Sequence, residues 1–223
     1  MNLQVNRNQV FQAVEQAAIE SLRKPESVKV IAVTKYVDSS IAKGLVEAGV
    51  EHIGENRVDK FLDKYRALAD HNLTWHLIGT LQRRKVKDVI NYVDYFHALD
   101  SVSLAQEIQK RADKPIKCFL QVNISREESK HGFMKEEIDQ VLEQLQDLDK
   151  VELVGLMTMA PIGATDSELN NIFAETKRLQ EELSSRKLPH MPFTELSMGM
   201  SGDFKIAIAN GSTFVRIGTA FYK

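Results

Sequence analysis

The sequence has few of the features that mark secreted, membrane-bound or nucleic-acid-binding proteins. It holds a single cysteine, Cys118, in 223 residues, so no disulfide can form within the chain and a reducing compartment is indicated. No apolar run approaches the roughly 18 residues of a membrane span, and the N-terminus lacks the apolar core of a signal peptide. The net charge of −2 gives no electrostatic basis for binding nucleic acid or anionic membranes. We therefore expect a cytoplasmic protein that binds neither.

Metal-binding patterns are also missing. The six histidines show no ligand spacing, and the chain has no cysteine pair. His76 and His97 fall inside expected strands, where a histidine is usually a hydrogen-bonded core residue. We expect no metal site.

Strands and helices alternate along the whole chain. Apolar runs typical of buried strands fall at residues 30–35, 50–56, 75–79, 95–99, 116–124, 151–159, 195–200 and 213–222. Amphipathic helical patterns fall at residues 8–23, 39–48, 57–69, 85–92, 103–112, 135–148, 167–183 and 204–210. Asp38 or Ser39 is expected to cap the second of these helices, and Gly49 to end it.

Eight strand–helix units in a chain of this length predict one closed (β/α)₈ TIM barrel of class α/β, with residues 1–223 forming a single domain. The sequence stops soon after the eighth strand. We expect the extra N-terminal helix, residues 8–23, to cover the gap that this leaves in the helical ring.

In such barrels the functional site lies at the C-terminal ends of the strands, and phosphate is often held after strands seven and eight. Strand seven runs into Ser201 and Gly202 just before a helix, where backbone amides can bind an anion. Strand eight ends at Gly218 and Thr219, and Arg216 shares a face with Gly218. Turn glycines and a structural ion pair would explain either loop alone. The two together favour a phosphate site.

Lys35 follows the first strand, Val-Ile-Ala-Val-Thr, at the same end of the predicted barrel. The simplest interpretation is a lysine that extends into solvent. An amine held at a strand end and partly desolvated can instead attack a carbonyl. A phosphate site facing such a lysine leaves two chemistries open, a Schiff-base aldolase acting on sugar phosphates or a protein that binds pyridoxal phosphate (PLP).

The motifs strongly resemble the YggS/PROSC family of PLP homeostasis proteins. The matching stretches are AVTKY at 32–36, HIGENR at 52–57, WHLIGTLQ at 75–82, VNIS at 122–125, SKHGF at 129–133, GLMTMAP at 155–161, LSMGMSGDF at 196–204 and VRIGTAF at 215–221. They occur in order over nearly the whole chain. The resemblance implies the fold-type III PLP barrel, which is also the N-terminal domain of alanine racemase. One stretch departs from the family: many relatives read GPLQSNK where this chain has Gly79-Thr80-Leu81-Gln82-Arg83-Arg84-Lys85.

The resemblance also implies roles for single residues. Lys35 would hold PLP as a Schiff base, the internal aldimine, and Ser201, Gly218 and Thr219 would hold its phosphate. Arg216 matches an arginine that faces the pyridine nitrogen in alanine racemase, although contact with the phosphate stays open. Asn56 is expected to line the pocket.

The family is linked to PLP supply rather than to turnover, so the resemblance implies a PLP carrier or regulator without catalytic residues. Its implied partners are PLP-dependent apoenzymes and small amines or amino acids, and we expect a monomer. The alternative is a PLP-dependent amino-acid racemase. Racemases, however, take a second base from another domain, which this sequence does not contain.

Overall fold

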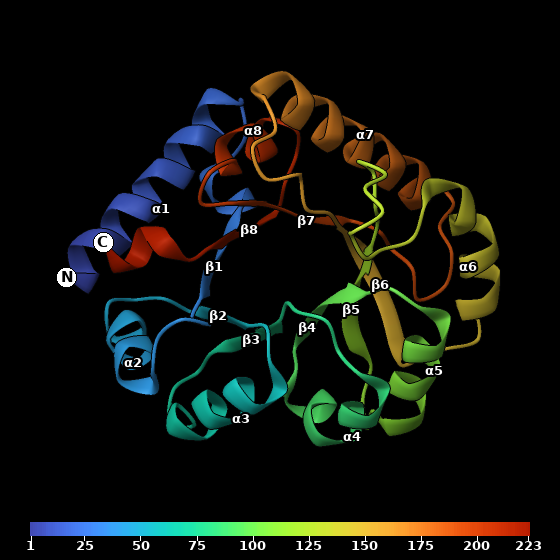
Figure 1. Ribbon diagram of the computed structural model, residues 1–223, viewed down its shortest axis with the longest axis horizontal. Coiled ribbons are helices and arrows are strands. Elements are labelled where there is room, and N and C mark those ends of the chain that lie inside the picture. Colours follow the sequence, from blue (N-terminus) through green and yellow to red (C-terminus); the bar gives the residue numbers. More distant parts are fainter.

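Eight parallel strands form a closed barrel in the computed structural model, which describes residues 1–223 (Figure 1). Each strand pairs with its neighbours in sequence, and β1 closes the ring against β8, with Val30 opposite Val215. The predicted (β/α)₈ architecture is confirmed. The strands are β1 Lys29–Val33, β2 His52–Glu55, β3 Thr74–Leu77, β4 Tyr95–Leu99, β5 Ile116–Gln121, β6 Val151–Met157, β7 Glu195–Met200 and β8 Phe214–Ile217.

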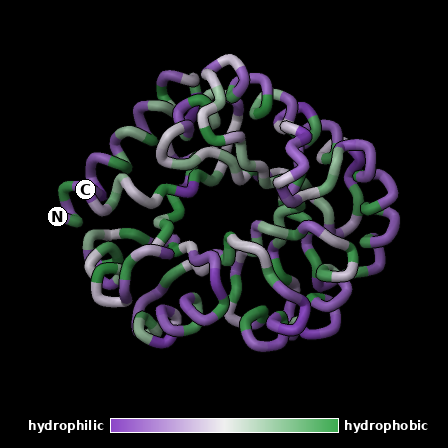
Figure 2. The backbone as a smooth tube through the Cα atoms, viewed as in Figure 1, coloured by the Kyte–Doolittle hydropathy of each residue, from purple (hydrophilic) through white to green (hydrophobic).

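The helices surround this barrel, and their hydrophilic residues gather on the outer turns (Figure 2). They are α1 Leu3–Glu20, α2 Ser39–Glu47, α3 Val58–Ala67, α4 Val86–Val89, α5 Val102–Arg111, α6 Ile138–Leu145, α7 Asp166–Ser185 and α8 Phe204–Ala209. None of them is both long enough and apolar enough to cross a bilayer.

Local sequence explains where several helices start and stop. The Asp38 carboxylate accepts a hydrogen bond from the Ile41 amide at 3.0 Å and so caps α2. Gly49, with a φ of +97°, follows the end of that helix in a conformation that favours glycine. Both expectations for this helix are met. Thr165 and Glu168 form a capping box at the start of α7.

Helix α1 lies beside α8 and the C-terminal 3-10 turn Thr219–Tyr222, and so completes the outer ring (Figure 1). The Asn6 side-chain amide donates to the carbonyl oxygens of Phe221 and Lys223, both at 2.9 Å. The helix begins at Leu3, earlier than predicted, because Asn2 caps it by accepting from the Val5 amide. The predicted gap-covering role is confirmed.

Several strands end earlier than the apolar runs predicted. β1 ends at Val33 rather than at residue 35, β5 at Gln121, β6 at Met157 and β8 at Ile217. The residues beyond these ends turn over the rim of the barrel. Residues 219–222 form a 3-10 turn, not an extension of the last strand. The predicted helix at 85–92 is likewise broken into short turns around α4.

The interior of the barrel is not purely aliphatic. Phe119 and Phe214 meet edge to face, with ring centroids 5.7 Å apart. His76 and His97 lie among these rings and are fully buried, as expected for core histidines. Cys118 is buried as well, and burial raises the pKa of its thiol.

Candidate functional site

A cavity of about 650 Å³ opens at the C-terminal end of the barrel. All six residues singled out from the sequence line its wall: Lys35, Asn56, Ser201, Arg216, Gly218 and Thr219. They come from the ends of strands that are far apart in the chain, so the closed barrel brings them together. The volume is in the range that holds a small organic cofactor.

Lys35 is exposed and lies on a turn, which agrees with the simpler interpretation of a lysine that extends into solvent and not with a partly desolvated amine at a strand end. The turn is closed by a hydrogen bond from the Val37 amide to the Thr34 carbonyl, at 3.2 Å. The Lys35 Nζ atom lies 4.8 Å from the centre of the Tyr36 ring, a cation–π contact at the mouth of the cavity. The amine is therefore accessible to a ligand that enters from solvent.

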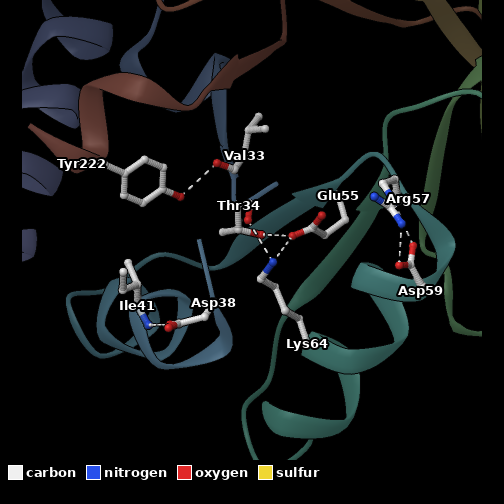
Figure 3. Close-up of polar contacts among 9 residues, drawn as sticks. All are labelled: Val33, Thr34, Asp38, Ile41, Glu55, Arg57, Asp59, Lys64 and Tyr222. Atoms are coloured by element: carbon white, nitrogen blue, oxygen red, sulfur yellow. Dashed lines mark hydrogen bonds and ion pairs between the residues drawn. The ribbon is translucent and has the colours of Figure 1, made fainter. Parts of the chain in front are cut away.

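Beneath this turn lies a buried cluster of charged and polar groups (Figure 3). Lys64, from α3, forms an ion pair with Glu55 at the end of β2, and both side chains are almost inaccessible to solvent. Lys64 Nζ also donates to the Thr34 carbonyl at 2.9 Å, and the Thr34 hydroxyl donates to Glu55 at 2.7 Å. The ion pair thus anchors the residue that precedes Lys35.

Tyr222 supports the same strand end from the other side. Its hydroxyl donates to the Val33 carbonyl at 2.9 Å (Figure 3). Burial, together with the nearby Glu55 carboxylate, raises the pKa of the Tyr222 phenol. The phenol therefore stays protonated and keeps donating this hydrogen bond.

Arg216 lies in the wall of the cavity and is almost completely buried. Its Nη1 atom donates to the Ser197 hydroxyl at 2.5 Å, and Nη2 donates to the Thr158 carbonyl at 3.2 Å. The guanidinium contacts no carboxylate, so the structural ion pair considered above is not formed. Burial lowers the pKa of Arg216 to about 10 despite the opposing field of Asp203, so the group is a cation at neutral pH.

The loops after β7 and β8 meet at the cavity. The Gly218 amide donates to the Ser201 hydroxyl at 3.3 Å, which joins the two loops. The backbone amides of Ser201 and Gly202 donate to no protein group. A Cβ atom added at Gly202 would find no atom within 4 Å. Free amides beside open space fit a bound anion.

Asn56 and Thr80 line the neighbouring part of the wall. Their two loops are in close contact, because a Cβ atom on Gly79 would lie 2.3 Å from the Asn56 carbonyl oxygen. Arg84, in the stretch that departs from the family, instead donates to Gln82 on the exposed surface. The departure from the family thus leaves Gly79 and Thr80 at the cavity, with Arg84 outside it.

Other lining residues were not predicted as site residues. Gln121 ends β5, and His131 reaches the cavity from the following loop, its Nδ1 atom 3.5 Å from the Asp100 carboxylate. Ser197, which lies behind Arg216, was missed as well. The available signal was a polar residue next to apolar residues at the C-terminal end of β5 for Gln121 and in the middle of β7 for Ser197.

Comparison with known proteins places the chain among barrels of this type. Residues 14–223 match the family described as alanine racemase, N-terminal domain. A pyridoxal phosphate homeostasis protein of Aquifex aeolicus is 36% identical over 228 residues, covering 100% of this chain and 98% of that protein. The Escherichia coli K12 protein of the same name is 34% identical, covering 97% of this chain and 94% of its own.

Solved structures agree. PipY of Synechococcus elongatus PCC7942 with PLP bound superposes with a TM-score of 0.83 at 35% identity, covering 94% of this chain and 98% of PipY. Alanine racemase of Corynebacterium glutamicum superposes with a TM-score of 0.76 at 14% identity, and this chain covers 61% of it. The latter likeness concerns the fold alone.

Proposed function

This chain belongs to the alanine racemase N-terminal domain family, and on that premise we propose that it is a PLP-binding protein of intracellular PLP homeostasis, a carrier or regulator. The observation that carries the proposal is the single cavity lined by the Lys35 amine, the loop of Ser201 and Gly202, and the Arg216 guanidinium. The PLP bound to PipY supports the same assignment.

The residues fit the cofactor in chemistry and in space. PLP needs an amine for its aldehyde, donors for its phosphate and room for its ring. Lys35 is exposed at the mouth, the amides of Ser201 and Gly202 are free, and Arg216 has no carboxylate partner. When bound, PLP supplies an aldehyde that condenses reversibly with amines and a ring that withdraws electrons.

Each residue then has a distinct role. Lys35 would hold the aldehyde end of PLP through its amine, and other amines could take its place. Ser201, Gly218 and Thr219 would hold the phosphate, and Asn56 would border the ring. Arg216 can only donate hydrogen bonds, to the ring nitrogen or to the phosphate. At the ring nitrogen, a cationic donor would keep that atom unprotonated and weaken the ring's electron withdrawal.

These features favour storage and transfer of PLP over turnover. We propose that residues 1–223 act as one domain, a cytoplasmic monomer that exchanges PLP with small amines, amino acids and PLP-dependent apoenzymes. No residue is assigned a catalytic role.

Borohydride reduction of protein incubated with PLP tests the binding mode. We expect visible absorbance that borohydride abolishes, with mass analysis locating the adduct on Lys35. Lys35→Ala should show neither. Lys130→Ala is the matched control, because Lys130 lies on a loop near the mouth and pairs with Glu127 at 3.0 Å. Absence of absorbance in the wild-type protein would refute PLP binding, and an adduct elsewhere would refute the assignment of Lys35.

Turnover is tested separately. PLP-loaded protein is incubated with L-amino acids, and D-isomers are measured against Lys35→Ala. We expect no Lys35-dependent product. A rate of about 1 per second or more, ordinary for an enzyme, would instead establish the racemase alternative.

A further inference from the structure

A continuous line of hydrogen-bonded side chains crosses the interior of the barrel. It starts at Arg216, whose Nη1 atom lies 2.5 Å from the Ser197 hydroxyl. Ser197 Oγ lies 2.7 Å from His97 Nδ1, and His97 Nε2 lies 2.8 Å from His76 Nδ1. His76 Nε2 lies 2.9 Å from His52 Nδ1. Five strands, β8, β7, β4, β3 and β2, each contribute one residue.

This line joins two cavities. Arg216 lines the large cavity at the C-terminal ends of the strands. His52, the first residue of β2, lines a second cavity of about 480 Å³ together with Lys29 and Glu51, at the N-terminal ends of the strands. The middle members Ser197, His97 and His76 are fully buried. Branched apolar side chains usually fill the interior of such a barrel, so this polar core is unusual.

The two central histidines are neutral. Burial, and then the neighbouring Arg216 cation, hold the pKa of His97 well below its ordinary value. Burial and the adjacent imidazoles do the same for His76. A neutral imidazole has one N–H donor and one bare nitrogen acceptor. Each ring can therefore donate a hydrogen bond to only one of its two neighbours in the line. The line thus runs in one of two senses, with all donors pointing either away from Arg216 or toward it.

The Arg216 charge selects the sense. Arg216 donates to Ser197, so the Ser197 hydroxyl is free to donate to His97 Nδ1. His97 then carries its proton on Nε2 and donates to His76, which does the same toward His52. In this sense every N–H and O–H dipole points away from the cation. The reverse sense would aim the His97 N–H toward Arg216 and is electrostatically disfavoured.

We propose that Ser197, His97 and His76 form a polarised relay that positions Arg216, stabilising its buried cation and aiming its remaining N–H groups into the cofactor cavity. The relay replaces the carboxylate that a buried arginine would otherwise need. The proposal concerns the protein itself, and only its consequence for PLP rests on the proposed function.

Nitrogen NMR of ¹⁵N-histidine-labelled protein without PLP tests the sense directly. We expect His97 and His76 each to show a protonated Nε2 and a bare Nδ1, unchanged from about pH 8 to about pH 6. His190, on an exposed turn, serves as an internal reference. A proton on Nδ1 of His97, or a rapid mixture of tautomers, would overturn the relay whether or not the protein binds PLP.

Two serine variants test the link to Arg216. Ser197→Ala removes the hydroxyl between Arg216 and His97. Ser212→Ala is the control, because Ser212 is equally buried but donates to the Met198 carbonyl at 2.6 Å. We expect Ser197→Ala to release the His97 tautomer preference and to raise the PLP dissociation constant about tenfold, the loss of one charge-assisted hydrogen bond. Ser212→Ala should do neither. Equal effects of the two variants would mean that Ser197 is only structural.

A second pair of variants, at the half-buried His52, tests the relay independently in case the serine variants misfold. In His52→Asn the side-chain oxygen can still accept from His76, whereas His52→Leu has no acceptor. The relay predicts that His52→Leu alone changes the His76 nitrogen signals. Identical His76 signals in the two variants would contradict it. If wild-type protein fails to bind PLP while the tautomers are as expected, the proposed function fails and the relay stands.

Discussion

Single ionisable residues inside this barrel are held in one protonation state by burial. His76 and His97 stay neutral because the folded protein lowers the pKa of both imidazoles. Arg216 stays charged because a pKa of about 10 is still far above neutral pH. The positive charge that Arg216 contributes to the wall of the cavity is thus independent of ordinary changes in pH.

Acid should destabilise the protein through these two histidines. In the unfolded chain their pKa is about 6.5, so below this value the unfolded state binds more protons than the folded state. The contribution of the two histidines to the free energy of unfolding is fully present above about pH 6.5. It falls as the pH drops below this value, by up to about 1.4 kcal/mol per pH unit for each histidine. Urea unfolding between about pH 7.5 and about pH 5.5 measures the slope.

The variants His76→Phe and His97→Phe provide the comparison for this slope. Each should flatten the pH dependence relative to wild type, whatever its effect on stability at neutral pH. Unchanged slopes in both would show that other groups cause the acid sensitivity.

Substitution by alanine should destabilise the protein at one glycine near the cavity and have little effect at another. Gly79→Ala places a Cβ atom 2.3 Å from the backbone oxygen of Asn56, whereas Gly202→Ala places one in open space. We expect Gly79→Ala to cost more than about 2 kcal/mol, because backbone must move, and Gly202→Ala less than about 0.5 kcal/mol. Denaturant unfolding distinguishes them. A tolerated Gly79→Ala would show that the loops of Asn56 and Thr80 are loosely packed.

Between elements, one buried ion pair connects α3, β2 and the turn that carries Lys35. Lys64→Met would leave Glu55 charged and buried without its ionic partner, with only the Thr34 hydroxyl donating to it, and such a loss typically costs about 3–5 kcal/mol. The double variant Lys64→Met/Glu55→Leu removes both charges and should recover much of this loss. Thermal and denaturant unfolding of the set measure it. Additive losses in the double variant would mean that the two side chains act independently.

The elements themselves were largely predictable from the chain. Alternating apolar runs and amphipathic patterns gave all eight strands, since a parallel barrel strand is buried on both faces. The ends of strands were harder, because the turn at Thr34–Val37 depends on a hydrogen bond that no local pattern reveals. This is why Lys35 is exposed rather than partly desolvated.

The parts of the site that could not be predicted depend on contacts between residues that are far apart in the sequence. Lys64 lies three residues after Phe61 and four before Leu68, on the buried stripe of α3. The sequence therefore shows a lysine on an apolar helix face, but it does not show that Glu55 is the carboxylate with which this lysine pairs. The line from His52 to Arg216 joins residues that are up to 164 positions apart (216 − 52) and needs the closed barrel. By contrast, all six predicted site residues line one cavity, because the barrel rule fixes which strand ends meet.

For the whole molecule, α1 is the element that completes the ring. Asn6→Ala removes two hydrogen bonds to the carbonyls of Phe221 and Lys223. We expect a loss of about 1–3 kcal/mol, measured by urea unfolding. Asn8→Ala, on the exposed side of the same helix, should change stability by less than about 0.5 kcal/mol. A similar loss for both variants would show that helix propensity is responsible, and not the hydrogen bonds from Asn6 to residues 221 and 223.

The contact between α1 and residues 221–223 also bears on how the chain folds. Helix α1 docks against the turn Thr219–Tyr222, far later in the sequence, and β1 has one of its two neighbours only once β8 has joined the sheet. Such distant pairings slow folding. Until β8 pairs with β1, the sheet therefore has two free edges that are open to wrong partners.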